Sequence, residues 1–260
     1  MATESLVRDV PALGKRVHRL GLSGTFGLDD AGCREALERL RYVLWTPRMR
    51  SLTAPLRDAL RRDRERHVVA TGPFLAYFPG AVRKGAENAL RVLGTDYLDV
   101  FHLFWLSKMS AFTGAVQDEL LALKAEGKVR AVGASIHDRP RAGRLAEDSI
   151  LDLLMIRYNA AHPGAERDVF PHLARRHPAV VAYTATSWRK LLRRPKGWDG
   201  PVMTAGDCYR WVLGNADVDV VLTGPRNVAE LRENLAAVEK GPLAEQDAAW
   251  MREFGRAVHG

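Results

Sequence analysis

The chain has 260 residues, of which 47% are hydrophobic and 27% are charged, so its length and composition suit one globular domain, spanning residues 1–260, with a large core. No run approaches the ~18 to 20 apolar residues that cross a bilayer, and no apolar stretch follows a basic N-terminus, so we expect a cytoplasmic protein without membrane contact. The formal net charge of +8 favours anionic ligands, but the basic residues are spread along the chain without interleaved aromatic residues, which argues against nucleic-acid binding.

Segments with helical periodicity alternate with short β-rich segments along nearly the whole chain. A first strand leads into the glycine-rich run GLSGTFG, and helices separated by strands are then expected at 31–40, 53–60, 81–93, 114–124, 141–146, 167–175, 205–213 and 228–238. A last helix is expected at about 243–258. About eight such units predict an α/β protein whose parallel strands close into a (β/α)8 barrel with a C-terminal helix. An open doubly wound sheet is disfavoured because no GxGxxG run follows any predicted strand.

The two cysteines, Cys33 and Cys208, both fall in expected helices. Two cysteines exclude a disulfide framework, and the long separation between them excludes the spacing of metal ligands. We therefore expect reduced thiols with a structural role and no metal site.

The stretch from 218 to 238, VDVVLTGPRNVAELRENLAAV, forms one strand-turn-helix unit. A β-branched strand leads through Thr223, Gly224 and a proline into a helix whose apolar residues recur at helical spacing. The start of a helix presents unpaired backbone N–H groups and the positive end of the helix dipole, and Arg226 and Asn227 add a charge and a donor there. This combination predicts a phosphate seat, although similar turns also occur without a ligand.

Four motifs, in order along the chain, resemble those of the aldo-keto reductases. They are LGTDYLD at 93–99, GKVR at 127–130 with Gly133 and Ser135 after it, Tyr158-Asn159 at the end of the sixth strand, and the unit at 223–234. The resemblance covers almost the whole chain and implies a barrel whose floor is plugged by an N-terminal β-hairpin, here around 13–22. It also implies that the first strand ends in Gly21, Gly24 and Thr25.

The resemblance implies NADP(H) as the cofactor. Arg226, Glu233 and Asn234 match positions that hold the 2′-phosphate and the adenosine in the family. Glu230 stands where many members have Gln or Arg, and a carboxylate there would repel a phosphate.

The nicotinamide end of the resemblance is mixed. Ser135 and Tyr183 match positions that hold and stack the nicotinamide, whereas Ile136 and Met155 replace the Asn and Gln that orient its carboxamide. The predicted cofactor-binding set is Ser135, Tyr183, Thr223, Gly224, Arg226, Asn227, Glu233 and Asn234.

The catalysts of the family are a Tyr phenol, a Lys that lowers the pKa of this phenol, an Asp paired with the Lys, and a His that orients the substrate. By resemblance, the Asp, Tyr, Lys and His positions hold Trp45, Arg50, Gly72 and Phe104. Loss of one general acid costs on the order of 10² to 10⁴ in rate, and the guanidinium of Arg50 releases no proton near neutral pH. We therefore expect no ordinary carbonyl reductase activity.

Other residues are expected to converge at the barrel mouth, where the loops after the strands carry function. Alternation along the sixth strand places Arg157 on its inward face, and adjacent loops bring His137 and His162. The candidate catalytic set is Arg50, His137, Arg157 and His162. The predicted substrate pocket has aromatic walls from Trp45, Phe74, Phe104, Trp105 and Trp188. Cations between aromatic walls suit a flat or conjugated anionic ligand.

These residues also have structural interpretations, which stay open at this point. Arg157 pairs with a loop carboxylate such as Glu166 in one of them, and His162, which precedes a proline, fixes its loop in another. Trp45 and Phe104 fill the space of the charged residues that the family has there.

Three functions are compatible with the sequence. An NADP(H)-dependent oxidoreductase that acts on a small aromatic or anionic metabolite, with His137 or His162 as the acid, predicts NADPH binding. A non-redox lyase, isomerase or cyclase that stabilises an anion with Arg50 and Arg157 predicts turnover without nicotinamide oxidation. An inactive binding or regulatory protein predicts binding without turnover. Descent favours the first, with a small-molecule substrate as partner.

Overall fold

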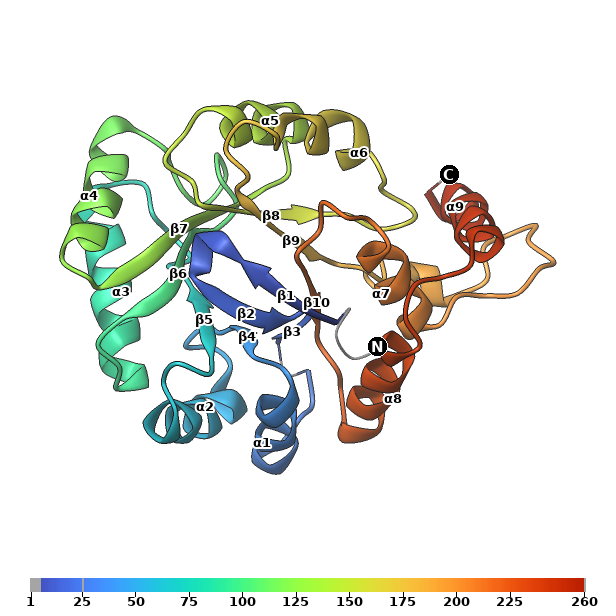
Figure 1. Ribbon diagram of the computed structural model, residues 1–260, viewed down its shortest axis with the longest axis horizontal. Coiled ribbons are helices and arrows are strands. Elements are labelled where there is room, and N and C mark those ends of the chain that lie inside the picture. The colour runs from blue at the N-terminus through green and yellow to red at the C-terminus, as the bar shows by residue number, and fades with distance from the viewer. Residues whose placement is uncertain (1–5, 25, 260) are drawn as a thin grey trace.

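The computed structural model describes residues 6–24 and 26–259. The chain opens with an antiparallel hairpin of β1 (Val7–Val10) and β2 (Lys15–His18), joined by the 3-10 turn η2 (Pro11–Leu13). Three apolar side chains of this hairpin are buried among residues that line the inside of the barrel: Val10, Leu13 and Val17. The hairpin therefore plugs one end of the barrel, as the resemblance implies, and it crosses the centre of the ring of strands in Figure 1.

Eight parallel strands form a closed barrel, in which the last strand pairs with the first. They are β3 (Leu20–Ser23), β4 (Tyr42–Leu44), β5 (Val68–Thr71), β6 (Leu98–Leu103), β7 (Val129–Ile136), β8 (Leu153–Arg157), β9 (Ala179–Tyr183) and β10 (Val220–Thr223). These short apolar runs form strands because both of their faces are buried, one inside the barrel and one under the helices. The predicted (β/α)8 barrel is confirmed, and the open doubly wound sheet is excluded.

The helices surround the strands (Figure 1). They are α1 (Asp30–Arg39), α2 (Arg50–Arg62), α3 (Pro79–Leu93), α4 (Gly114–Ala125), α5 (Arg139–Glu147), α6 (Ala165–Asp168), α7 (Ala205–Leu213), α8 (Val228–Glu239) and α9 (Glu245–His259). The prediction of one helix at 167–175 is wrong. There α6 ends early and the 3-10 turn η3 (Phe170–His172) follows, because Pro171 lacks an N–H and its ring clashes with a preceding helical turn.

Polar side chains determine where several helices begin. Asp29, Thr113 and Asn227 accept hydrogen bonds from backbone N–H groups in the first turns of α1, α4 and α8, and Asp138 does so in α5. Thr204 opens α7 with a capping box. Each of these helices follows a barrel strand in the chain. Their N-termini therefore lie on the side of the barrel where the strands end.

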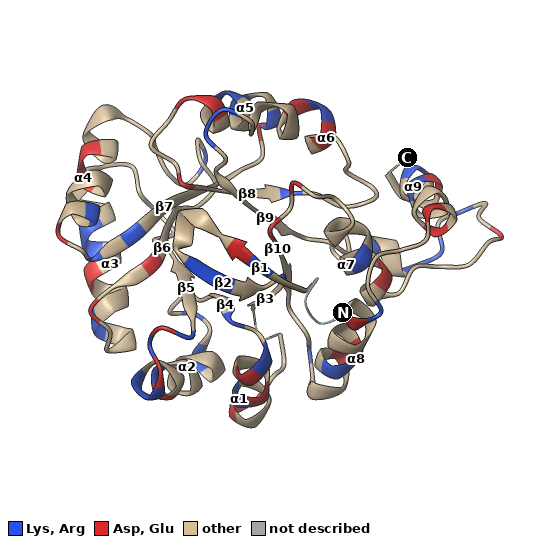
Figure 2. Ribbon diagram, in the orientation of Figure 1, with Lys and Arg blue, Asp and Glu red and all other residues tan. Residues whose placement is uncertain are grey.

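The cysteines lie in helices, as expected from the sequence. Cys33 in α1 and Cys208 in α7 are buried and free, and burial raises the pKa of both thiols. Among the described residues, no group of His, Cys, Asp or Glu is arranged to hold a metal ion, and no helix is long and apolar enough to cross a membrane. Basic and acidic residues alternate around the ring of helices (Figure 2).

Alternation along the strands divides the core into two layers. Tyr42, Leu44 and Val100 belong to the cluster that fills the barrel, whereas Val43 and Phe101, from the same strands, pack under the helices. The parity of a residue in its strand therefore decides whether its side chain can reach the mouth.

Candidate functional site

Exposed apolar side chains surround the carboxyl ends of the strands. In the described part of the chain, seven large hydrophobic side chains are exposed, and six of them lie in the loops after β3, β5, β6 and β9: Phe26, Leu75, Tyr77, Phe78, Trp105 and Trp188. Trp105 and Trp188 also have left-handed backbone, with φ of 45° and 56°, which is strained for a bulky residue. Strained backbone and exposed apolar surface both mark functional sites.

On the β7–β9 side of the mouth, the phenol of Tyr183 contacts the imidazole of His137. The hydroxyl of Tyr183, the last residue of β9, lies 3.1 Å from Nε2 of His137, the first residue after β7. The ring of Trp105 packs edge-on to His137, with centroids 5.7 Å apart, and its backbone N–H donates to Oγ of Ser135 at 2.8 Å. The structure thus brings four predicted site residues together. Sequence reasoning missed the contact between Tyr183 and His137 because no spacing along the chain relates β7 to β9.

Arg157 is a cation without a partner at this edge. It ends β8 and is in register with Tyr183 on β9, so the two residues lie at the same level of the barrel. Its side chain is half-buried and forms no hydrogen bond or ion pair with another described residue. An anion beside a partly buried, unpaired guanidinium would form charge-assisted hydrogen bonds with it, so Arg157 is available to an anionic ligand.

The positive charge of Arg157 also acts on two histidines. Burial lowers the pKa of His137, and Arg157 and Lys108 lower it further. Burial and then Arg157 lower the pKa of His162 to about 4. Both imidazoles are therefore uncharged near pH 7. Nδ1 of His162 lies 3.2 Å from Oδ1 of the fully buried Asn159, which supports the loop-fixing interpretation.

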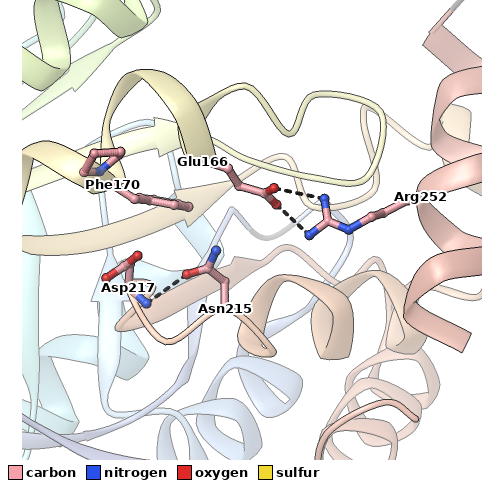
Figure 3. A pocket seen from close by; sticks show the side chains of 6 residues that line it. Glu166, Phe170, Asn215, Asp217 and Arg252 are labelled. Atoms are coloured by element: carbon pink, nitrogen blue, oxygen red, sulfur yellow. Dashed lines mark hydrogen bonds and ion pairs between the residues drawn. The ribbon is translucent and has the colours of Figure 1, made fainter. Parts of the chain in front are cut away.

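The predicted alternative in which Arg157 pairs with Glu166 is wrong. Glu166 pairs with Arg252 of α9 at 2.9 Å and accepts a hydrogen bond from the hydroxyl of Tyr158 at 2.6 Å. Figure 3 shows this ion pair beside a cavity of about 400 Å³ lined by Glu166, Phe170, Pro171, Asn215, Asp217 and Arg252. The cavity borders the turn that leads into the amino end of β10, so it is separate from the mouth.

The β4–β6 side of the mouth is apolar. Trp45 is fully buried and its indole N–H donates to the hydroxyl of Thr53 in α2 at 3.1 Å. It belongs to the helix-side layer because Leu44 takes the inward place on β4, so the prediction of Trp45 as a pocket wall is wrong. Phe74 and Phe104 lie together, with ring centroids 6.1 Å apart, and Phe104 packs with the residues inside the barrel.

No side chain fits at Gly72 on this side. A Cβ there would lie 2.1 Å from the carbonyl oxygen of His102, because β5 and β6 approach closely. The ring of His102 stacks on Phe104 and is fully buried, with neither nitrogen bonded to a described residue, and burial lowers its pKa to about 3. Arg50 begins α2 with an exposed side chain that bonds to no other described residue. Among these residues, no neutral O–H donor reaches the mouth.

A carboxylate already occupies the start of α8. Glu230 accepts hydrogen bonds from the backbone N–H of Arg226 at 2.9 Å and from its Nε at 2.8 Å, and these contacts lower the pKa of the Glu230 carboxyl group. Arg189 lies 3.9 Å from the same carboxylate, and Asn227 caps the helix by accepting from the N–H of Glu230 at 2.8 Å. Arg226, the predicted ligand of the phosphate, is therefore already paired with the carboxylate of Glu230. The spacing of four residues between Arg226 and Glu230 is the sequence signal for this pair.

Two other predicted cofactor residues of this unit lie inside the protein. The hydroxyl of Thr223 donates to the hydroxyl of Tyr209 at 2.9 Å, and Nδ2 of Asn234 donates to Oγ1 of Thr223 at 3.2 Å. Both Thr223 and Asn234 are buried, so they join β10 to α7 and α8 and are not accessible to a cofactor. Glu233 is exposed on α8.

The turn after β10 is held against the loop after β3. A Cβ on Gly224 would lie 2.7 Å from the carbonyl oxygen of Ser23, so only glycine permits this approach. Gly21 lies in β3 and Gly24 follows it, as the resemblance implies, whereas Thr25 lies outside the described residues.

The sequence model of the Aldo/keto reductase family matches residues 76–194, which include β6 to β9 and the loops that carry the phenol, the imidazole and Arg157. The chain belongs to the aldo-keto reductase superfamily. A curated relative in Escherichia coli (strain K12), named NADH-specific methylglyoxal reductase, is 26% identical over 217 residues, which are 69% of this chain. The match spans 66% of that relative's length.

Solved structures of aldo-keto reductases share the fold. The holo form of an aldo-keto reductase from Bacillus halodurans superimposes with a TM-score of 0.80 at 19% identity, over 95% of each chain. The glycerol dehydrogenase from Gluconobacter oxydans superimposes with a TM-score of 0.76 at 19% identity, over 98% of this chain and 97% of the other.

Proposed function

We propose that this superfamily member is an oxidoreductase that binds a nicotinamide dinucleotide and acts on a small metabolite that carries an anionic group beside its carbonyl or alcohol. The observation that carries the proposal is the unpaired guanidinium of Arg157, at the level of Tyr183 on the neighbouring strand. A 2-oxo acid fits this arrangement, because a carboxylate held by Arg157 brings the adjacent carbonyl oxygen toward the phenol. The name of the Escherichia coli relative supports a small carbonyl substrate.

We further propose that the active site is not the usual one of the superfamily. By resemblance, the positions of the usual catalysts hold Trp45, Arg50, Gly72 and Phe104. Three observations support their loss: Trp45 faces the helices, Gly72 has no room for a side chain, and Phe104 packs on Phe74.

The start of α8 fits a dinucleotide but suits the 2′-phosphate of NADP(H) less well. The helix has 12 residues and its N-terminus is exposed, so its first backbone N–H groups are open to an anionic group of a ligand. NADP(H), which the resemblance implies, requires that Arg226 leave Glu230 and that a phosphate approach this carboxylate. The proposal is therefore that NADH binds better than NADPH.

The residues of this chain have separate tasks in the proposed reaction. A nicotinamide held in the mouth would supply or accept the hydride. Arg157 holds the carboxylate of the substrate, Trp105 and Trp188 cover its apolar body, and Phe74 and Phe104 keep water from the opposite side.

Two measurements test the function. Titration with NADH and NADPH, followed by nicotinamide fluorescence, measures cofactor affinity, and absorbance of the nicotinamide measures turnover of a panel of 2-oxo acids and neutral aldehydes. We expect binding of NADH and its oxidation by at least one 2-oxo acid. No binding at millimolar cofactor overturns the proposal and leaves non-redox chemistry or ligand binding as the function of the mouth.

The variant Arg157→Gln tests the contact of Arg157 with an anion. It removes a charge-assisted hydrogen bond worth about 1.5 to 3 kcal/mol, so we expect the KM for a 2-oxo acid to rise about ten- to hundredfold. The KM for a neutral aldehyde should stay the same, as should both values in the control Arg91→Gln on the surface of α3. An equal rise of KM for charged and neutral substrates would refute a carboxylate contact.

A further inference from the structure

We propose that Tyr183 is the proton donor of this enzyme, that His137 resupplies its proton, and that Arg157 stabilises the negative charge that the transfer creates. This inference rests on the proposed oxidoreductase function. It reassigns Tyr183, which the resemblance marks as a residue that stacks on the nicotinamide.

The geometry assembles three groups from neighbouring strands. The hydroxyl of Tyr183 lies 3.1 Å from Nε2 of His137, and their rings are perpendicular, with centroids 5.9 Å apart. Arg157 is the register partner of Tyr183, on the strand between β7 and β9. Trp105 packs against His137 from the loop after β6 and limits where the imidazole can move. A phenol, an imidazole and a permanent cation therefore meet at one edge of the mouth.

The charges around this cluster suit the transfer. Arg157 from β8 and Lys108 from the loop after β6 act on His137, which is exposed to solvent. Burial raises the pKa of Tyr183 to about 12, and Arg157 opposes this rise. At neutral pH, the phenol therefore carries its proton and the imidazole is uncharged. The positive charge of Arg157 stabilises the phenolate of Tyr183 more than the neutral phenol, so it assists the loss of the proton.

The proposed step balances as follows. Hydride addition to the carbonyl carbon moves the pair of π electrons to the carbonyl oxygen, and the O–H bond of Tyr183 breaks as its proton joins this oxygen. The phenolate of Tyr183 then takes the proton from Nε2 of His137 as Nδ1 of His137 takes a proton from solvent. Proton exchange with solvent then returns the imidazole to the tautomer that carries its proton on Nε2. The net reaction consumes one hydride and one solvent proton for each alcohol formed, and the protein returns to its starting charge.

These three groups have the same chemical types as the phenol, histidine and cation of the superfamily, but they stand on different strands. The usual set is expected around β4, β5 and β6, whereas Tyr183, His137 and Arg157 stand on or directly after β9, β7 and β8. An acid at this edge lies beside Arg157, so one carboxylate contact positions the carbonyl and places it next to the donor.

The variant Tyr183→Phe separates proton donation from stacking, because phenylalanine keeps the ring and removes only the hydroxyl. We expect kcat for the 2-oxo acid to fall by about 10² to 10⁴ while the Kd of NADH stays the same. Tyr97→Phe is the matched control: it removes a tyrosine hydroxyl that bonds to Glu65 before β6, far from the mouth, and should leave kcat unchanged.

His137→Ala tests the resupply of the proton. We expect a lower kcat that added imidazole restores, which a purely structural role of His137 would not produce. Circular dichroism and thermal unfolding establish that each variant is folded.

The outcomes distinguish the two levels of the proposal. An active wild-type protein whose Tyr183→Phe variant keeps its kcat overturns the assignment of the acid and leaves the oxidoreductase function standing. Loss of NADH affinity in Tyr183→Phe with an unchanged kcat also overturns it, in favour of a cofactor contact. A wild-type protein that binds neither dinucleotide overturns both the assignment and the function.

Discussion

The two sides of the barrel mouth differ in what their inward positions carry. On the β4–β6 side, Leu44, Gly72 and Phe104 present carbon or backbone to the mouth, and the histidine below them is sealed in. On the β7–β9 side, Tyr183 and Arg157 stand level with each other and Tyr183 bonds to the imidazole of the next loop. One scaffold thus has a side whose inward positions are apolar and a side whose inward positions carry hydrogen-bonding groups and charge.

Ligand chemistry in this fold is expected where a charged group has no partner within the chain. A cation such as Arg226, whose charge is neutralised by Glu230 within the chain, contributes mainly to local structure. Arg157 has no such partner among the described residues, so its charge remains available to a ligand. We therefore place the proposed function on the side of the mouth whose charged group has no ion-pair partner within the described part of the chain.

The largest expected effect comes from forcing a side chain into the apolar side. Gly72→Ala places a Cβ 2.1 Å from the carbonyl oxygen of His102, so β5 and β6 must separate. We expect the free energy of unfolding to fall by about 3 kcal/mol or more in urea denaturation. Gly80→Ala in α3, where a Cβ meets nothing within 4 Å, is the control and should be neutral or slightly stabilising. Unchanged stability of Gly72→Ala would mean that this side has room for a catalytic lysine.

A smaller effect should come from the sealed histidine on the same side. Burial lowers the pKa of His102 to about 3, so the folded state keeps this ring neutral while the unfolded state protonates it near pH 6.5. The stabilisation is complete above pH 6.5 and is lost progressively as pH falls toward 3. Between pH 6.5 and 4.5 the wild-type protein should lose about 2 to 3 kcal/mol at this site alone.

The variant His102→Leu isolates this contribution. Its unfolding free energy should fall less than that of the wild type over the same pH range, as measured by denaturant titration at each pH. Identical pH dependence of the two proteins would show that the ring reaches water, and would remove the contrast between a sealed and an open side.

The smallest expected effect concerns the paired cation. Glu230→Gln removes the negative charge beside Arg226, so we expect the Kd of NADPH to fall about tenfold, equivalent to 1.4 kcal/mol, with little change for NADH. Glu35→Gln is the matched control, because Glu35 forms a similar two-point pair with Arg232, at 2.7 and 2.9 Å, on the surface of α1 and α8. Tighter binding of NADPH than NADH by the wild type would contradict the role given to Glu230.

Much of the fold follows from patterns that are local in sequence. Helical periodicity predicts α7 at its observed bounds and most other helices closely, because the apolar spacing that buries one face is written in consecutive residues. The helix expected at 167–175 ends early because Pro171 interrupts it, although the apolar spacing continues past this residue.

The site was less predictable than the fold. A motif match predicts Trp45 at the mouth, whereas side-chain alternation along β4 directs it toward α2. Alternation along β8 predicts Arg157 on the inward face, but the sequence does not show that Glu166 pairs with Arg252 of the last helix and not with Arg157. The contact of Tyr183 with His137 joins residues 46 positions apart, and no periodicity reports such a pair.

The closed barrel, the resemblance to the family and the types of residue at the strand ends can be predicted from the sequence, because burial patterns and motifs are properties of neighbouring positions. Which of those residues contact one another, and which charges are neutralised, depends on the three-dimensional packing. The register between parallel strands and the packing of distant helices set the distances between charges, and electrostatic and hydrogen-bond energies depend on those distances and not on separation along the chain.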